Sequence, residues 1–192
     1  MLPVPPCGTE PARAHATALE FRRLAGAADA ARYRAVRLEC LARFPDHFGS
    51  SHGEESRKAR LGLEAPIEEG AADRFMIGAF AGERLVGIAG FVREARGKAA
   101  HRGEIVHMYV DPAHHGRRVG EALLRAVIDA AFALEGMRQV ELNVVATNAA
   151  ATALYGRLGF RVHGEIPDCF RAAGRSWNQL LMSLPRDRWL AG

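Results

Sequence analysis

VDPAHHGRRVGEALL, residues 110–124, is the most informative stretch of this chain. It begins as the end of an apolar, β-branched strand, turns at Pro112, and continues through two glycines and two arginines into an amphipathic helix. A helix N-terminus presents unpaired backbone N–H groups and a partial positive charge, and both favour phosphate oxygens. Gly116 and Gly120 allow a ligand to approach the backbone closely. The stretch therefore predicts a strand-to-helix turn that binds a phosphorylated ligand.

A second unusual stretch, residues 148–160, reads NAAATALYGRLGF, and a predicted strand separates it from the first. Together they resemble the acetyl-CoA-binding core of the GNAT N-acetyltransferases, in which an Arg/Gln-x-x-Gly-x-Gly/Ala loop is followed by Asn-x-x-Ala-x-x-Leu-Tyr-x-x-x-Gly-Phe. The resemblance implies an enzyme that moves an acetyl group from acetyl-CoA to a primary amine by direct attack in a ternary complex. Two positions depart from the family pattern, because His115 stands where Arg or Gln is usual and Arg118 replaces a glycine. A looser match covers Arg37-Leu38-Glu39, Phe44-Pro45 and Phe48-Gly49-Ser50-Ser51.

Composition narrows the class of protein. A chain of 192 residues is long enough for one domain and short for two. The net charge of +4 comes almost wholly from arginine, and no block of basic residues predicts a nucleic-acid partner. No apolar run approaches the roughly 20 residues of a membrane helix. Cys7, Cys40 and Cys169 are few and widely spaced, which favours a reducing, cytoplasmic location.

The order of elements predicts an α/β fold. Strands are expected at residues 19–24, 74–80, 84–93, 103–110, 139–145, 160–166 and 177–184, and helices at 28–44, 54–63, 149–158 and over the apolar pattern that ends near Gly136. These elements predict a mixed, mostly antiparallel central sheet flanked by helices. The GNAT resemblance further implies a splay between the strand at 103–110 and the strand at 139–145. Residues 1–17 are expected to be a flexible tail, and residues 18–192 a single N-acetyltransferase domain.

Tyr155 is the expected general acid. It follows Asn148 by seven positions, nearly two helical turns, so both side chains point to one face about 10 Å apart along the axis. Asn148 is expected to cap the helix and contact the pantetheine arm of the cofactor. The resemblance implies that the Tyr155 phenol gives a proton to the departing thiolate.

Glu104 is the expected general base, because an ammonium group must lose a proton before it attacks a thioester. In histone-acetyltransferase-type members a strand Glu followed by Ile-Val serves as base, and Glu104-Ile105-Val106 is similar. Apolar neighbours raise the pKa of a carboxylate, which suits a base. His107 is the alternative, on the opposite strand face unless a bulge intervenes. Other members place an acid five residues before the motif Asn, where this chain has Asn143.

The resemblance also implies that the strand at 103–110 hydrogen-bonds the pantetheine and that one of its N–H groups polarises the thioester carbonyl. The expected cofactor-binding residues are Met108, Tyr109, Val110, His115, Gly116, Arg117, Arg118, Val119, Gly120 and Asn148.

Several further features leave alternatives open. The histidines near the turn do not have metal-ligand spacing, and Cys169 has no assignable partner, so we expect no metal and no cysteine nucleophile. The acceptor is expected to contact the loops at residues 46–73 and 167–176. Two other activities stay open: a protein lysine or N-terminal acetyltransferase, and a non-catalytic acyl-CoA sensor of the same fold. The expected partner is a small-molecule or peptide amine, with no membrane and no nucleic acid; a homodimer is left open.

Overall fold

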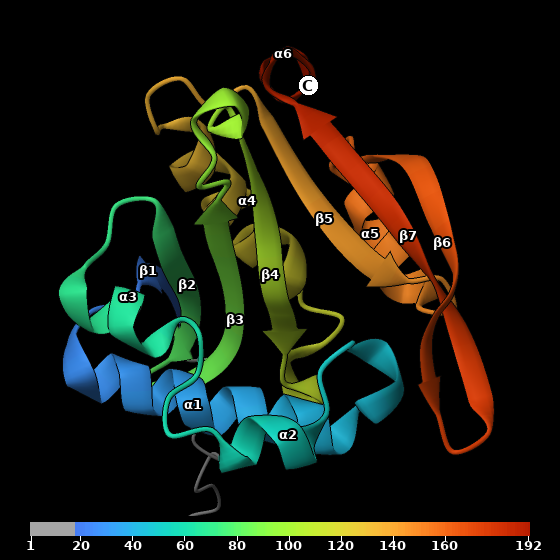
Figure 1. The fold of residues 1–192 in the computed structure, drawn as a ribbon. Helices are drawn as coiled ribbons and strands as arrows, with labels where there is room; N and C mark the ends of the chain where they lie inside the picture. The colour runs from blue at the N-terminus through green and yellow to red at the C-terminus, as the bar shows by residue number, and fades with distance from the viewer. Residues whose placement is uncertain (1–17) are drawn as a thin grey trace, which may run out of the picture.

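Seven strands form one sheet in the order β1-β2-β3-β4-β5-β7-β6 in the computed structural model, which describes residues 18–192 (Figure 1). Every neighbouring pair is antiparallel except β4 and β5, which are parallel. The strands are β1 (Leu19–Arg23), β2 (Arg74–Ala81), β3 (Arg84–Arg93), β4 (Arg102–Val110), β5 (Gln139–Val145), β6 (Arg161–Ala172) and β7 (Arg175–Pro185). The expected mixed, mostly antiparallel sheet is confirmed. The expected tail at residues 1–17 lies outside the described residues.

Helices cover both faces of the sheet (Figure 1). The α-helices are α1 (Gly26–Arg43), α2 (His52–Arg57), α3 (Glu64–Glu69), α4 (Val119–Phe132), α5 (Ala149–Arg157) and α6 (Arg186–Ala191). Short 3-10 turns occur at η1 (Pro45–His47), η2 (Gly97–Ala99) and η3 (Pro112–His114). Within residues 18–192, no helix is both long enough and apolar enough to cross a bilayer.

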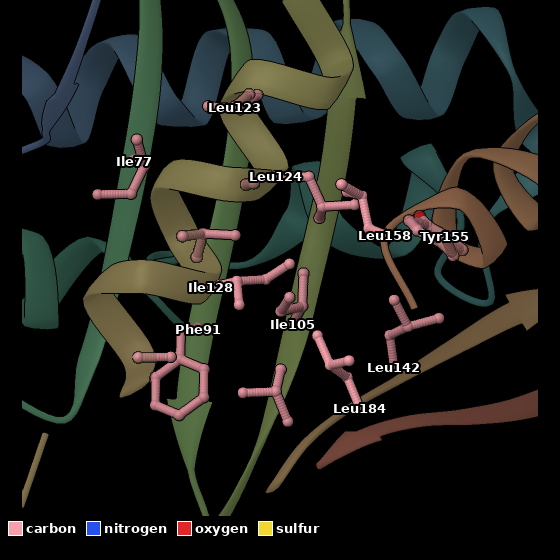
Figure 2. Close-up of a cluster of buried hydrophobic side chains, with 14 of the residues drawn as sticks. Ile77, Phe91, Ile105, Leu123, Leu124, Ile128, Leu142, Tyr155, Leu158 and Leu184 are labelled. Carbon is pink, nitrogen blue, oxygen red and sulfur yellow. The ribbon is translucent and has the colours of Figure 1, made fainter. Parts of the chain in front are cut away.

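Two apolar cores result from the alternation of side chains along the strands. Phe75 and Ile77 of β2 belong to the core under α4, which Figure 2 shows with Leu124 and Ile128. Met76, between them in sequence, belongs to the core formed with α1 and α3. The helix α4 contributes Leu123, Leu124, Val127, Ile128 and Ala131, the apolar spacing expected from the sequence. The central strands are therefore packed on both faces.

The sheet divides between β4 and β5. Only Arg102–Ile105 pair with Gln139–Leu142, although β4 continues to Val110 and β5 to Val145. Beyond these pairs the two strands diverge (Figure 1). A register shift against β3 lies in the same part of β4, where His107 has a φ of 57°. The expected splay is confirmed, and it leaves residues 106–110 of β4 without a β5 neighbour.

Two expectations about local structure were wrong. Of the helix expected over residues 54–63, only the part up to Arg57 is helical. Ser51 and Glu54 form a reciprocal capping box that starts α2 at His52, and the next helix, α3, begins only at Glu64. The loop expected over residues 167–176 is mostly strand: β6 runs to Ala172, and the chain turns at Ala173 and Gly174 into β7. The tail helix α6 was not predicted.

Candidate active site

A cavity of about 700 Å³ lies where β4 and β5 diverge, within the size range of small-molecule and cofactor sites. Its wall combines β4, β5, the start of α4, one face of α5 and residues 47–50. The predicted site residues that line it are Glu104, Met108, Tyr109, Val110, His115, Gly116, Arg118, Val119, Gly120, Asn148 and Tyr155. Arg117 does not line it. The structure thus brings together eleven of the twelve predicted site residues, from three separate segments of the chain.

The N-terminus of α4 opens onto this cavity without a cap. The N-cap residue, Arg118, offers no side-chain hydrogen bond to the helix. Within the described residues, no acceptor occurs for the backbone N–H groups of residues 116–121. Gly116 has a φ of +73°, and a Cβ there would meet nothing within 4 Å, so the turn is open on that side. Six consecutive free N–H groups at a helix start fit the oxygens of a diphosphate.

The two residues that depart from the family pattern take different positions. His115 folds back, and its Nε2–H donates to the carbonyl oxygen of Val110 at 2.8 Å. That bond ties the turn to the end of β4. Arg118 adopts the left-handed conformation, with φ 58°, and its side chain is exposed without an ion-pair partner among the described residues. Since the cavity stays open beside Arg118, its guanidinium does not close the turn.

The helix α5 places Asn148 and Tyr155 on the cavity wall. Asn148 caps the helix as expected, because its Oδ1 accepts from the N–H of Ala151 at 3.1 Å. Tyr155 is only 7% exposed and lies beside Leu158 at the edge of the main core (Figure 2). Burial raises the pKa of Tyr155 to about 12, so its phenol stays protonated at neutral pH. A protonated phenol at a cavity wall can serve as a proton donor.

Glu104 lies on the half-buried part of β4 that still pairs with β5. Burial raises its pKa, the nearby charge of Glu141 raises it further, and a hydrogen bond from Asn143 opposes both effects. That bond joins Asn143 Nδ2 to Glu104 Oε1 at 2.9 Å. The carboxylate therefore combines access to the cavity with an elevated proton affinity, as a general base requires.

His107, the alternative base, also lines the cavity, because the bulge in β4 turns it there. Burial lowers the pKa of His107 to about 3, and the charges of Arg37 and Lys58 lower it further. Its Nδ1 lies 3.0 Å from the hydroxyl oxygen of Tyr33. Burial also raises the pKa of Tyr33, so the hydroxyl donates to Nδ1 and Nε2 carries the ring proton. With Nδ1 occupied and so low a pKa, His107 is a poor proton acceptor.

The sequence predicted that the acceptor contacts residues 46–73 and 167–176, and the far wall of the cavity includes residues of both segments, although no single residue of this wall was predicted as a site residue. This wall is formed by Arg37, Phe44, His47, Phe48, Gly49, Ser50, Phe170 and Gln179. Gly49 packs so closely on Phe170 that a Cβ at Gly49 would lie 2.5 Å from Cε1 of the ring. Arg175 bonds Asp46 at 2.9 Å, which joins the same two segments at the surface. The looser family match at Arg37 and residues 44–51 was the available signal.

Comparison with known proteins identifies the family. The sequence model of the Acetyltransferase (GNAT) family matches residues 37–160. Over 98 residues the chain is 40% identical to the N-alpha-acetyltransferase RimI of Mycobacterium tuberculosis, covering 51% of this chain and 59% of that protein. Over 117 residues it is 33% identical to a mycothiol acetyltransferase of Brachybacterium faecium, covering 60% of this chain and 35% of that protein. The chain thus spans about three fifths or less of these relatives.

Among solved structures, the fold matches yncA of Salmonella typhimurium, a putative acetyltransferase determined with its cofactor acetyl-CoA. The TM-score is 0.71 at 21% identity, covering 88% of this chain and 94% of that one. The GNAT fold expected from the two sequence motifs is thereby confirmed. Because the family match extends over most of the chain, from within α1 to the residue before β6, this protein belongs to the GNAT family of acetyltransferases.

Proposed function

We propose that this protein is an acetyl-CoA-dependent N-acetyltransferase that acts on a primary amine by direct attack within a ternary complex. The observation that carries the proposal is the run of free N–H groups at residues 116–121, of which all but Arg117 line a cavity that continues into the split of the sheet. A diphosphate fits the first feature, and an extended arm fits the second. When bound, acetyl-CoA supplies the activated acetyl thioester.

The chain's own backbone would hold the cofactor. Residues 116–121 bind the diphosphate through their N–H groups, with the positive end of the α4 dipole behind them. Residues 106–110 have no β5 partner, so their outward N–H and C=O groups pair with the amides of the pantetheine. The side-chain amide nitrogen of Asn148 is free to join them, because only its oxygen is used in the cap.

Two side chains transfer the protons of the reaction. Glu104 accepts a proton from the incoming ammonium group, directly or through a water molecule, and the free amine then attacks. Tyr155 holds its proton at the phenol oxygen and delivers it to the departing sulfur as the C–S bond breaks; the second proton, on the newly acetylated nitrogen, is then lost and restores the Tyr155 phenol. Neither Cys40 nor Cys169, the cysteines of the described residues, lines the cavity, which favours direct transfer over a cysteine-bound acetyl group.

A second candidate is acetylation of a protein N-terminus, because the chain is 40% identical over 98 residues to a protein named N-alpha-acetyltransferase. A peptide must enter the far end of the cavity in an extended form. Residues 47–50 and Phe170 line the cavity there, and Gly49 lies close to the Phe170 ring. An amine panel that includes short peptides separates the two candidates.

Thermal unfolding with and without acetyl-CoA tests the cofactor. A ligand at 100 times its dissociation constant stabilises the folded state by about 2.7 kcal/mol, which raises the midpoint by several degrees. NAD and ATP serve as controls for non-specific phosphate binding. A midpoint that does not change with acetyl-CoA, or changes equally with ATP, would contradict the proposal. Release of free CoA thiol with an amine panel then tests the transfer step.

A further inference from the structure

Arg37 of α1 is a buried cation at the far wall of the cavity. Its side chain lines the cavity, yet the residue is only 2% exposed. Its Nε is fully buried and has no hydrogen-bond partner. The guanidinium makes one weak contact, from Nη1 to the Sγ of Cys40 at 3.8 Å.

No carboxylate within residues 18–192 forms an ion pair with Arg37. The buried acids of the neighbouring layer already have partners: Glu55 bonds Lys58 at 2.7 Å, and Glu64 bonds Arg34 at 2.8 Å. An unpaired charge in the interior is strongly unfavourable, and burial of this kind normally comes with a counter-ion. The missing counter-ion is therefore the feature of Arg37 that needs a physical reason.

The contact of Arg37 with Phe48 does not replace the missing counter-ion. The carbon of the guanidinium lies 5.0 Å from the centroid of the Phe48 ring, a cation–π distance. A cation–π contact is electrostatic attraction to the ring and supplies no hydrogen-bond acceptor for the guanidinium N–H groups. Those groups form the fork that matches the two oxygens of a carboxylate. Phe48 thus contacts the guanidinium without satisfying its hydrogen bonds.

We propose that Arg37 binds the carboxylate of the acceptor, so that the substrate is an amino acid or a closely related amine that carries its own carboxylate. The inference rests on the function proposed above and names its substrate class. Arg37 and Glu104 line the same cavity, one positive and the other with an acidic side chain. A zwitterion matches this pair, with its ammonium group toward Glu104 and its carboxylate toward Arg37. The rings of Phe48 and Phe170 offer apolar surface for the remaining side chain.

The test compares L-amino acids, each paired with its own amide, as acceptors for the wild type and Arg37→Met. L-methionine and L-methioninamide are the first pair. In wild type, kcat/KM for the acid exceeds that for the amide. In Arg37→Met, the acid loses about 30-fold or more, as expected for a charged group left without its partner, while the amide changes little. Arg32→Met is the matched control: it removes one charge from the same helix, but Arg32 bonds Asp29 away from the cavity.

A stability measurement distinguishes ligand binding from a structural role. An arginine with no partner in the free protein should be dispensable for folding, so Arg37→Met keeps or raises the thermal midpoint without ligand. With CoA present, L-methionine raises the wild-type midpoint more than L-methioninamide does, and Arg37→Met abolishes the difference.

Equal use of acid and amide by wild type, or an acid preference that survives in Arg37→Met, would overturn the inference and leave the proposed function in place. Loss of folding in Arg37→Met would also count against it, since it would show that Arg37 is paired internally. Failure of the proposed function has a different signature, namely no stabilisation of the wild type by acetyl-CoA.

Discussion

Tyr155 has a hydroxyl group that folding does not require. Within the described residues its oxygen has no hydrogen-bond partner, and the ring is held by core packing and by an edge contact with Phe160. We expect Tyr155→Phe to lower kcat by about 100-fold, the usual contribution of a general acid. The thermal midpoint and the dissociation constant of acetyl-CoA should change little, because no bond in the free protein is lost. Steady-state kinetics measure kcat, and unfolding curves with and without acetyl-CoA report the thermal midpoint and cofactor binding. An unchanged kcat would mean that Tyr155 takes no part in the reaction.

Glu104 and His107 make opposite predictions for the dependence of rate on pH. A base must be deprotonated to act, so kcat/KM falls as the pH drops through its pKa. Glu104 has a pKa raised above the ordinary value near 4.5, so its acidic limb lies above that pH. His107, with a pKa of about 3, stays neutral throughout the limb. Glu104→Gln should abolish the limb and lower kcat/KM by about 100-fold, while His107→Asn should retain the limb. A limb that persists in Glu104→Gln would mean that another group is the base.

At the scale of elements, the bulge in β4 buries His107, so the free energy of unfolding depends on the protonation of this side chain. Its folded pKa of about 3 is below the unfolded value of 6.5, so the unfolded state binds a proton that the folded state does not. Stability therefore falls as the pH drops below 6.5, by at most about 1.4 kcal/mol per pH unit. His107→Asn should flatten this decline, because asparagine tolerates the φ of 57° and does not titrate. Urea unfolding at pH 7, 6 and 5 measures the free energy of unfolding of both proteins. The raised pKa of Glu104 stabilises the folded state as the pH falls, but this contribution is the same in the wild type and in His107→Asn.

His107→Val is the steric counterpart of that substitution. A β-branched residue in the left-handed region is strained, at a cost of about 1–3 kcal/mol in the free energy of unfolding, and the cost should be present at every pH. Equal stability of the Asn and Val variants would indicate that the bulge relaxes.

The contact between residues 47–50 and the β6–β7 hairpin should control the acceptor. In Gly49→Ala, the new Cβ displaces the ring of Phe170, which is half-buried on a hairpin and can move. We expect a KM for the amine raised several-fold, with the dissociation constant of acetyl-CoA unchanged. Gly53→Ala is the control, because a Cβ there meets nothing within 4 Å and Gly53 lies in α2, where alanine is favourable. A raised KM in both variants would point to a general effect on the segment.

The sequence predicted those elements whose burial follows a simple period. The bounds of β3 and β5 were predicted exactly, since their apolar residues end at turn or polar residues. The extension of β6 was missed because its residues are mostly exposed and it pairs only with β7, at the edge of the sheet, so no burial pattern marks it. Tyr155 and the turn at Gly116 lie in local motifs and were predictable. Arg37 was not, because its significance comes from a missing partner, which only the packed fold reveals.

At the scale of the whole molecule, the split is the structural basis of the site. The pairing of Arg102–Ile105 with Gln139–Leu142 holds the two halves of the sheet together at one end. Beyond this pairing, β4 is held by its pairing with β3 and by the two apolar cores. A cofactor arm between the diverging strands would act as a short additional strand. The free edge of β4 and the start of α4, far apart in sequence from α5, would then be bridged by one ligand.

Hydrogen exchange can show where acetyl-CoA binds on the backbone. Labelling for seconds reports local fluctuations, so it is insensitive to the global stabilisation that any ligand confers. With saturating acetyl-CoA, the amides within residues 106–110 that do not pair with β3, and those of residues 116–121, should gain strong protection, since each acquires an acceptor. The paired amides of β2 and β3 serve as the internal control, because their hydrogen bonds exist without ligand. Protection confined to residues 116–121 would mean that the diphosphate binds but the arm lies outside the split, and the catalytic roles given to Glu104 and Tyr155 would then be wrong.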